Sequence, residues 1–126
     1  MGTIIIVVAI GWASQYSPGV MERTILNQQR YGNLPMSLPV VDGYVAVLDC
    51  NRLGEIVYLR PEGGEWEKFL VTDCARRDGK DGTRTWMLKS NIIVEVDYKT
   101  AVRWNTVGRG KRVVVGMPIK LKYMCE

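Results

Sequence analysis

Short apolar segments separated by turn-forming residues recur along most of the chain. From residue 43 onward, β-branched and aromatic residues alternate with polar ones, and Gly, Pro, Asn or Asp stands at the end of each run. This pattern is typical of half-buried β-strands. The strands it predicts cover residues 43–49, 55–61, 66–73 and 91–97, with two closing strands within 111–124 that are interrupted at 116–118.

Two segments have the spacing of helices instead. The apolar residues of "VMERTI" (residues 20–25) share one helical face, which predicts a short helix from about residue 18 to 29. The segment "YKTAVRW" (98–104) predicts a second short helix that Asp97 can cap. Six to eight short strands with two short helices indicate a mainly β, closed architecture, and 126 residues correspond to about one domain.

The chain begins with an aliphatic run, "TIIIVVAI", from Thr3 to Ile10. The run is too short to cross a bilayer as a helix, so no membrane span is expected. Two interpretations remain open: the end of a signal peptide's hydrophobic core, or a first strand buried on both faces, which its β-branched content favours. We therefore divide the chain into an N-terminal segment, 1–10, and a domain, 11–126. An exposed copy of this run would be a strong strand-exchange element, which predicts possible homo-oligomers.

The segment "ARRDGKDGTRTW" (75–86) contains two Asp-Gly pairs, which predict a loop. Asp78 and Asp81 lack the alternating oxygen ligands and closing Glu of a calcium loop, so we expect no metal site there. The chain has no histidine, which excludes Ser/His triads and most catalytic zinc sites. No cofactor is expected.

The charge of +4 is unevenly distributed, since seven Lys and Arg residues and no acid lie between Tyr98 and Cys125. Such a segment can meet an anionic polymer, but it lacks the interleaved aromatic residues that single-strand binding uses. We therefore expect no specific nucleic-acid partner.

Two of the three cysteines end similar segments, "VLDC" at Cys50 and "VTDC" at Cys74. A disulfide between them would suit an exported protein, whereas two reduced thiols buried at strand ends would fit the same pattern. Both alternatives stay open at this point.

The order of three motifs resembles a known family. "ASQYSPG" (13–19), the "VTDC" strand end and "VEVDYKTAVRW" (94–104) resemble the barwin, expansin and rare lipoprotein A group. Its members begin with an Ala-Ser-Trp/Tyr-Tyr-Gly-Pro-Gly stretch, have a strand ending in Asn/Asp-Asp, and close with an Asp-Leu-Ser strand before an alanine-bearing helix. The resemblance covers roughly residues 11–115. It implies a six-stranded double-psi β-barrel, here with two short helices and an extra N-terminal strand.

The resemblance also implies where a site would lie. Asp73 corresponds to the aspartate of the group's cleft, and Asp97 to the aspartate before the helix. Lytic members carry a Thr-Ala-Ser/Asn-Gly-Glu loop and a downstream histidine, whereas this chain has "TILNQQRY" (24–31) and no histidine. Two roles for Asp73 remain open: a general acid, with Glu22 or Asp49 as its partner, or an ionised group that caps a loop.

Three functions follow from these observations. We expect a secreted or cell-envelope protein that binds a cell-wall polysaccharide or another envelope glycan, with Tyr16, Trp66, Trp86 and Asp97 at the binding face, and with Trp66 and Trp86 as the exposed aromatic pair. A lytic enzyme that uses Asp73 is the first alternative. A structural protein that assembles through residues 3–10 is the second.

Overall fold

The computed structural model describes residues 3–75 and 82–119. The strands are β1 (Ile5–Gln15), β2 (Gly43–Val47), β3 (Ile56–Pro61), β4 (Glu67–Cys74), β5 (Ile92–Val96) and β6 (Lys111–Pro118). The helices are α1 (Val20–Arg30), α2 (Thr83–Lys89) and α3 (Tyr98–Arg103), and a 3₁₀ turn, η1, covers Cys50–Arg52. The prediction of a mainly β fold with six strands and few short helices is confirmed.

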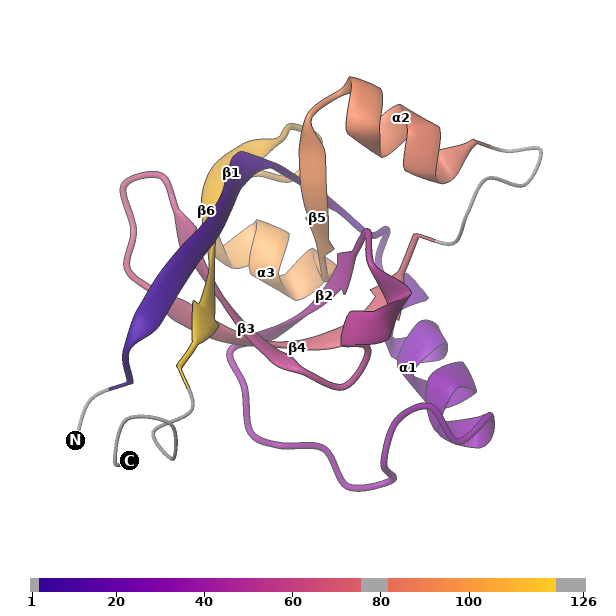
Figure 1. The fold of residues 1–126 in the computed structure, drawn as a ribbon. Coiled ribbons are helices and arrows are strands. Elements are labelled where there is room, and N and C mark those ends of the chain that lie inside the picture. Colours follow the sequence, from indigo (N-terminus) through magenta and orange to yellow (C-terminus); the bar gives the residue numbers. More distant parts are fainter. Residues whose placement is uncertain (1–2, 76–81, 120–126) are drawn as a thin grey trace.

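The six strands form one mixed sheet that closes on itself as a ring, in the order β1-β5-β2-β4-β3-β6 (Figure 1). The neighbours β1 and β5 are parallel, as are β2 and β4, and the other four pairs are antiparallel. Advancing every strand by three positions along the chain reproduces the same ring, so its order has an internal two-fold relation. In that relation β1, β2 and β3 correspond to β4, β5 and β6.

Inward-facing side chains fill the ring. On five of the strands they are two residues apart, as the period of a β-strand requires; they are Val45 and Val47, Val57 and Leu59, Phe69 and Val71, Val94 and Val96, and Val113 and Val115. Helix α3 adds Ala101 and Trp104, and the ring of Trp104 lies 5.9 Å from that of Phe69. These contacts form the main hydrophobic core.

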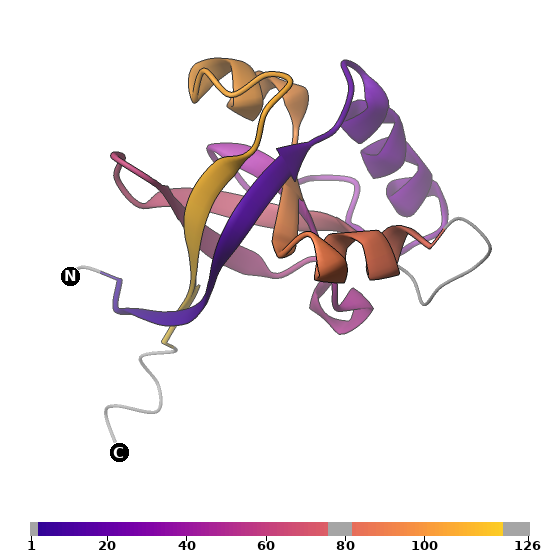
Figure 2. The same cartoon turned by 90° about the horizontal axis from the view of Figure 1, so that it is seen from above.

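Helices α1 and α2 lie outside the ring and on the same side of it (Figures 1 and 2). Helix α1 packs on β4, where the Thr72 hydroxyl donates a hydrogen bond of 3.1 Å to the sulfur of Met21. Helix α2 packs on β5 and buries Met87. No helix in residues 3–75 and 82–119 has the length and apolar character that crossing a bilayer requires.

The structure corrects four expectations about the elements. Residues 5–15 form one continuous strand of the ring, so the aliphatic run is not an extra strand, and the boundary between residues 10 and 11 falls inside β1. The run is not buried on both faces, because five of its aliphatic side chains are exposed. β6 continues through Gly116, where an interruption was expected. A side chain at this position would collide with Ile5 and Trp66, so the glycine allows close packing and does not end the strand.

The fourth correction concerns residues 75–86. Residues 83–89 form α2, which makes three α-helices in the described parts of the chain where two were expected. Gly82, with φ of 59°, lies just before the helix, and burial of Met87 holds the helix on the sheet. The loop prediction for residues 76–81, including Asp78 and Asp81, lies outside the described residues.

Cys50 and Cys74 form a disulfide, which confirms one of the two alternatives for these residues. The bond joins η1, just after β2, to the end of β4, and the two cysteines are 24 residues apart in sequence. Because β2 and β4 are parallel neighbours, the covalent link reinforces one end of a pair that the chain cannot connect by a hairpin.

Removal of this disulfide should lower the free energy of unfolding by about 3–4 kcal/mol, the chain-entropy value for a loop of this length. Urea denaturation of the Cys50→Ser/Cys74→Ser double variant measures the loss. A reducing agent should produce a similar loss in the wild type and none in the double variant. Equal stability of the oxidised and reduced wild type would show that the bond does not stabilise the fold.

Candidate functional site

Four residues form a row across the outer surface of four neighbouring strands. Ser14 on β1 pairs with Glu95 on β5, Glu95 pairs with Ala46 on β2, and Ala46 pairs with Asp73 on β4. On β2 and β5 the residues on both sides of this row point into the core, as Ala13 does on β1, so the row itself faces outward. The sheet thus places two carboxylates on either side of Ala46, a small residue that leaves space between them.

Asp73 is held by two side chains from the segment that connects β1 to β2. The hydroxyl of Tyr16 donates a hydrogen bond of 2.5 Å to Oδ2 of Asp73, and Nε2 of Gln28 lies 3.5 Å from Oδ1. Gln28 is buried on α1, where its Oε1 accepts a hydrogen bond of 2.8 Å from Asn33. β1 and α1 therefore fix the direction in which the Asp73 carboxylate points.

The surroundings favour the neutral forms of two groups in this cluster. Burial raises the pKa of the Tyr16 hydroxyl far above its usual range, and the hydrogen bond to Asp73 and the charges of Asp73 and Glu95 raise it further. Tyr16 thus stays a donor to Asp73. Burial also raises the pKa of Glu95, the nearby Ser14 hydroxyl lowers it, and the charge of Asp73 raises it again.

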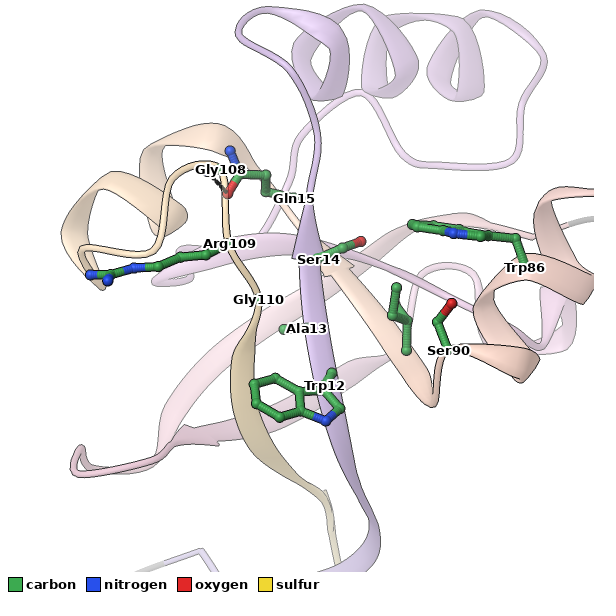
Figure 3. Close-up of a pocket in the computed structure, with 10 residues that line it drawn as sticks. Trp12, Ala13, Ser14, Gln15, Trp86, Ser90, Gly108, Arg109 and Gly110 are labelled. Carbon is green, nitrogen blue, oxygen red and sulfur yellow. Dashed lines mark hydrogen bonds between the residues drawn. The ribbon is translucent and has the colours of Figure 1, made fainter.

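Ser14 also connects this row to a groove. The Ser14 hydroxyl is buried and makes no hydrogen bond of standard distance and angle within the described residues, although it is close enough to Glu95 to affect the pKa of that carboxyl group. The groove beside it has a volume of about 460 Å³. Its lining comes from β1, α2, β5 and the segment before β6, and includes Trp12, Ser14, Gln15, Trp86, Ser90 and Arg109 (Figure 3).

Two tryptophans line the groove from different elements. Trp12 is on β1, where the guanidinium of Arg112 lies 5.8 Å from the centre of its ring, and Trp86 is on α2. Trp12 is 40% exposed and Trp86 50% exposed. Gly110 lies beside the Trp12 ring, and Ser14 points toward the side on which Trp86 lies (Figure 3). The groove therefore offers aromatic surface together with hydroxyl and amide groups, whereas the Arg109 guanidinium donates a hydrogen bond to the Asn105 carbonyl and extends away from both indoles (Figure 3).

The structure brings only some of the predicted site residues together. Tyr16 and Asp73 are in direct contact, and Trp86 lines the adjacent groove. Trp66 is not part of this lining; it lies against Gly116, and the guanidinium of Arg60 is 5.2 Å from its ring. Of the two tryptophans that were expected to be exposed, Trp86 is exposed, whereas Trp66 is partly buried and lies outside this groove.

Three predicted acids lie elsewhere. Asp97 is 4% exposed and caps α3, as expected, because its Oδ2 accepts a hydrogen bond from the Thr100 amide and its Oδ1 accepts from the Tyr44 amide and the Thr100 hydroxyl. Asp49 caps η1 through the Asn51 amide, and Glu22 is exposed on α1. Contact of Asp97 or Glu22 with a ligand stays a prediction.

Sequence reasoning missed Glu95 and the part that Ser14 plays. Both lie at outward positions of predicted or possible strands, and "VEV" shows that Glu95 points away from the core. The sequence gives no indication of which strands become neighbours, and that pairing puts Glu95 within the influence of Asp73. Trp12 is one of the four tryptophans of the chain, and no local pattern in the sequence marks it as a site residue.

Comparison with known proteins adds no assignment: no family model, no curated protein and no solved structure matches this chain. The described residues also contain no cluster of three Cys, Asp or Glu side chains that could hold a metal ion.

Replacement of Glu95 by Gln should stabilise the protein in a pH-dependent way. Unfolded Glu95 ionises near its usual pKa of 4.5, whereas folded Glu95 keeps its proton to a higher pH, so wild-type stability falls as pH rises through that interval. Glu95→Gln lacks this loss. Its advantage in free energy of unfolding should grow between pH 4 and neutral pH.

Thermal and urea denaturation at several pH values test this, with Glu65→Gln, at an exposed glutamate, as the control. A difference between Glu95→Gln and wild type that does not vary with pH would show that Glu95 titrates as it does in the unfolded chain.

Proposed function

We propose that the ring is a double-psi β-barrel of the barwin, expansin and rare lipoprotein A type. The support is its topology. Consecutive strands β1 and β2 are separated in the ring by β5, and consecutive strands β4 and β5 are separated by β2. Two such crossing connections, related by the internal two-fold order, are the interlocked halves that the resemblance implies.

We propose that the protein binds a glycan chain in the groove between Trp12 and Trp86. The observation that carries this proposal is the pair of half-exposed indoles on one groove, next to Ser14 and Gln15. Flat aromatic faces cover the apolar faces of sugar rings, while nearby polar groups hydrogen-bond the ring hydroxyls. Cell-wall polysaccharides and other envelope glycans have this combination of surfaces.

We also propose that the protein is secreted or located in the cell envelope. Structural disulfides persist in oxidising compartments, and the Cys50–Cys74 bond ties together two strand ends near the site. The ligand proposed for the groove occurs in the same compartments.

Cleavage of the glycan is a second candidate, and the row of outward-facing residues favours it. Asp73 and Glu95 are separated by one strand, so their backbones are about 10 Å apart. Inverting glycosidases place their carboxyl groups about 6.5–9.5 Å apart, and one of the two must carry a proton. Glu95 has the raised pKa of such an acid, whereas Asp73 is already bound by Tyr16. We rank binding first, because the loop glutamate and histidine of the lytic members are missing.

Binding is tested with purified peptidoglycan and with cellulose as probes, by co-sedimentation over a range of protein concentrations. Trp12→Ala and Trp86→Ala should each raise the Kd about tenfold, equivalent to about 1.4 kcal/mol, because each removes a stacking surface. Leu88→Ala, at an exposed residue of the same helix, is the matched control. Trp66→Ala distinguishes the groove from the aromatic pair first expected. Equal loss in all variants, or no binding by the wild type, would contradict the proposal.

Cleavage is tested by the release of soluble fragments from the same peptidoglycan between pH 4 and 8. We expect the wild type to release no more than Asp73→Asn does. Release that is lost in both Asp73→Asn and Glu95→Gln, while co-sedimentation is unchanged, would establish the second candidate. Thermal melts of both variants show whether the fold is intact.

A further inference from the structure

The first half of β1, residues 5–10, has a partner on one edge only. It pairs with β6 along its length, and the two strands extend together beyond the rest of the ring (Figure 2). On the other edge, pairing with β5 begins at Trp12, whose amide bonds the Asn91 carbonyl. Within the described residues, no strand pairs with this edge of residues 5–10. We call these residues the β1 edge.

The β1 edge is apolar and uncharged. Ile6, Val8 and Ile10 are 52%, 51% and 56% exposed, and residues 3–10 contain no Lys, Arg, Asp or Glu. Open edges in natural proteins usually carry a charged residue, a proline, a β-bulge or a covering segment that prevents pairing with another chain. The β1 edge has a register shift against β6 between Val7 and Ala9, but residues 3–10 carry no charge and no proline.

A cleft of about 260 Å³ lies beside the β1 edge. Val8 and Ala9 form its wall on β1, and Ile93 contributes from β5. The lining also includes the core residues Val47, Val57, Val94 and Val115, together with Leu48, Asp49, Arg52 and Met117. The sheet is thus open toward its core where β1 and β5 diverge, and the cleft can receive an aliphatic side chain.

We propose that the β1 edge of one molecule pairs with the β1 edge of a second copy, antiparallel and about a two-fold axis. A single added strand satisfies the unpaired backbone groups and directs alternate side chains into the cleft. Each copy supplies both the aliphatic strand and the cleft, as an isologous contact requires.

The absence of charge along the strand favours a second copy as the occupant. Two identical segments without charge meet at a two-fold axis with no like-charge repulsion. About half of each large side chain of the β1 edge is exposed and available to such a partner.

The proposal is independent of glycan binding, because Val8 and its cleft do not line the groove of Trp12 and Trp86. Sedimentation velocity at 1–100 μM protein measures the association, in a Cys125→Ser background that prevents intermolecular disulfides. We expect a dimer at the higher concentrations. Val8→Lys should weaken dimerisation at least tenfold, because it places a charge on the edge and in the cleft. Val102→Lys, at a valine of similar exposure on α3, should have no effect.

Hydrogen exchange of the unmutated sequence locates the contact without relying on a variant that could fail to fold. Amides of residues 5–10 should exchange more slowly at dimer-forming concentrations than after dilution, while those of β3 and β4 should not change. A monomer at all concentrations, a dimer that Val8→Lys leaves intact, or a dimer without protection in residues 5–10 would each overturn the proposal.

Discussion

The crossing of the chain between strands that are not ring neighbours is the constraint on which the arrangement depends. β1 and β2 follow each other in sequence but are separated in the ring by β5, and β4 and β5 are separated by β2. A tight turn joins only adjacent strands, so each of these connections must pass over the strand that lies between. The two long connections that result carry α1 and α2. These helices are therefore placed outside the ring, and they supply Gln28 to Asp73 and Trp86 to the groove.

The row of Ser14, Glu95, Ala46 and Asp73 places two acidic side chains at partly buried positions. Two acids on a partly covered surface repel each other, and the structure moderates this in different ways at the two positions. Asp73 receives the Tyr16 hydroxyl, a donor that the surroundings keep protonated. Burial gives Glu95 a raised pKa, so this carboxyl group keeps its proton to a higher pH than an exposed glutamate does. The two carboxylates are thus chemically distinct although both face outward from the same sheet.

The sequence was a good guide to features that depend on neighbouring residues. Alternation located β2, β3, β4 and β5 to within a few residues, and Asp97 was correctly placed as a helix cap. Helix α2 was missed because its segment is polar and only Met87 is deeply buried. Glu95 was missed for a different reason. Its importance comes from the register of β5 against β2 and β1, which is set by packing across the ring and has no local pattern.

The order of the ring also determines when the chain can fold during synthesis. Every one of the six strand pairs joins a strand from β1–β3 to a strand from β4–β6, so neither half contains a complete pairing of its own. The β3–β4 hairpin is the first pair that a growing chain can form, and β1 has no partner until β5 has been made. The contacts are thus long in sequence separation, a property that slows folding. A newly made chain therefore cannot close the ring until β6, the last strand of the ring, has been made.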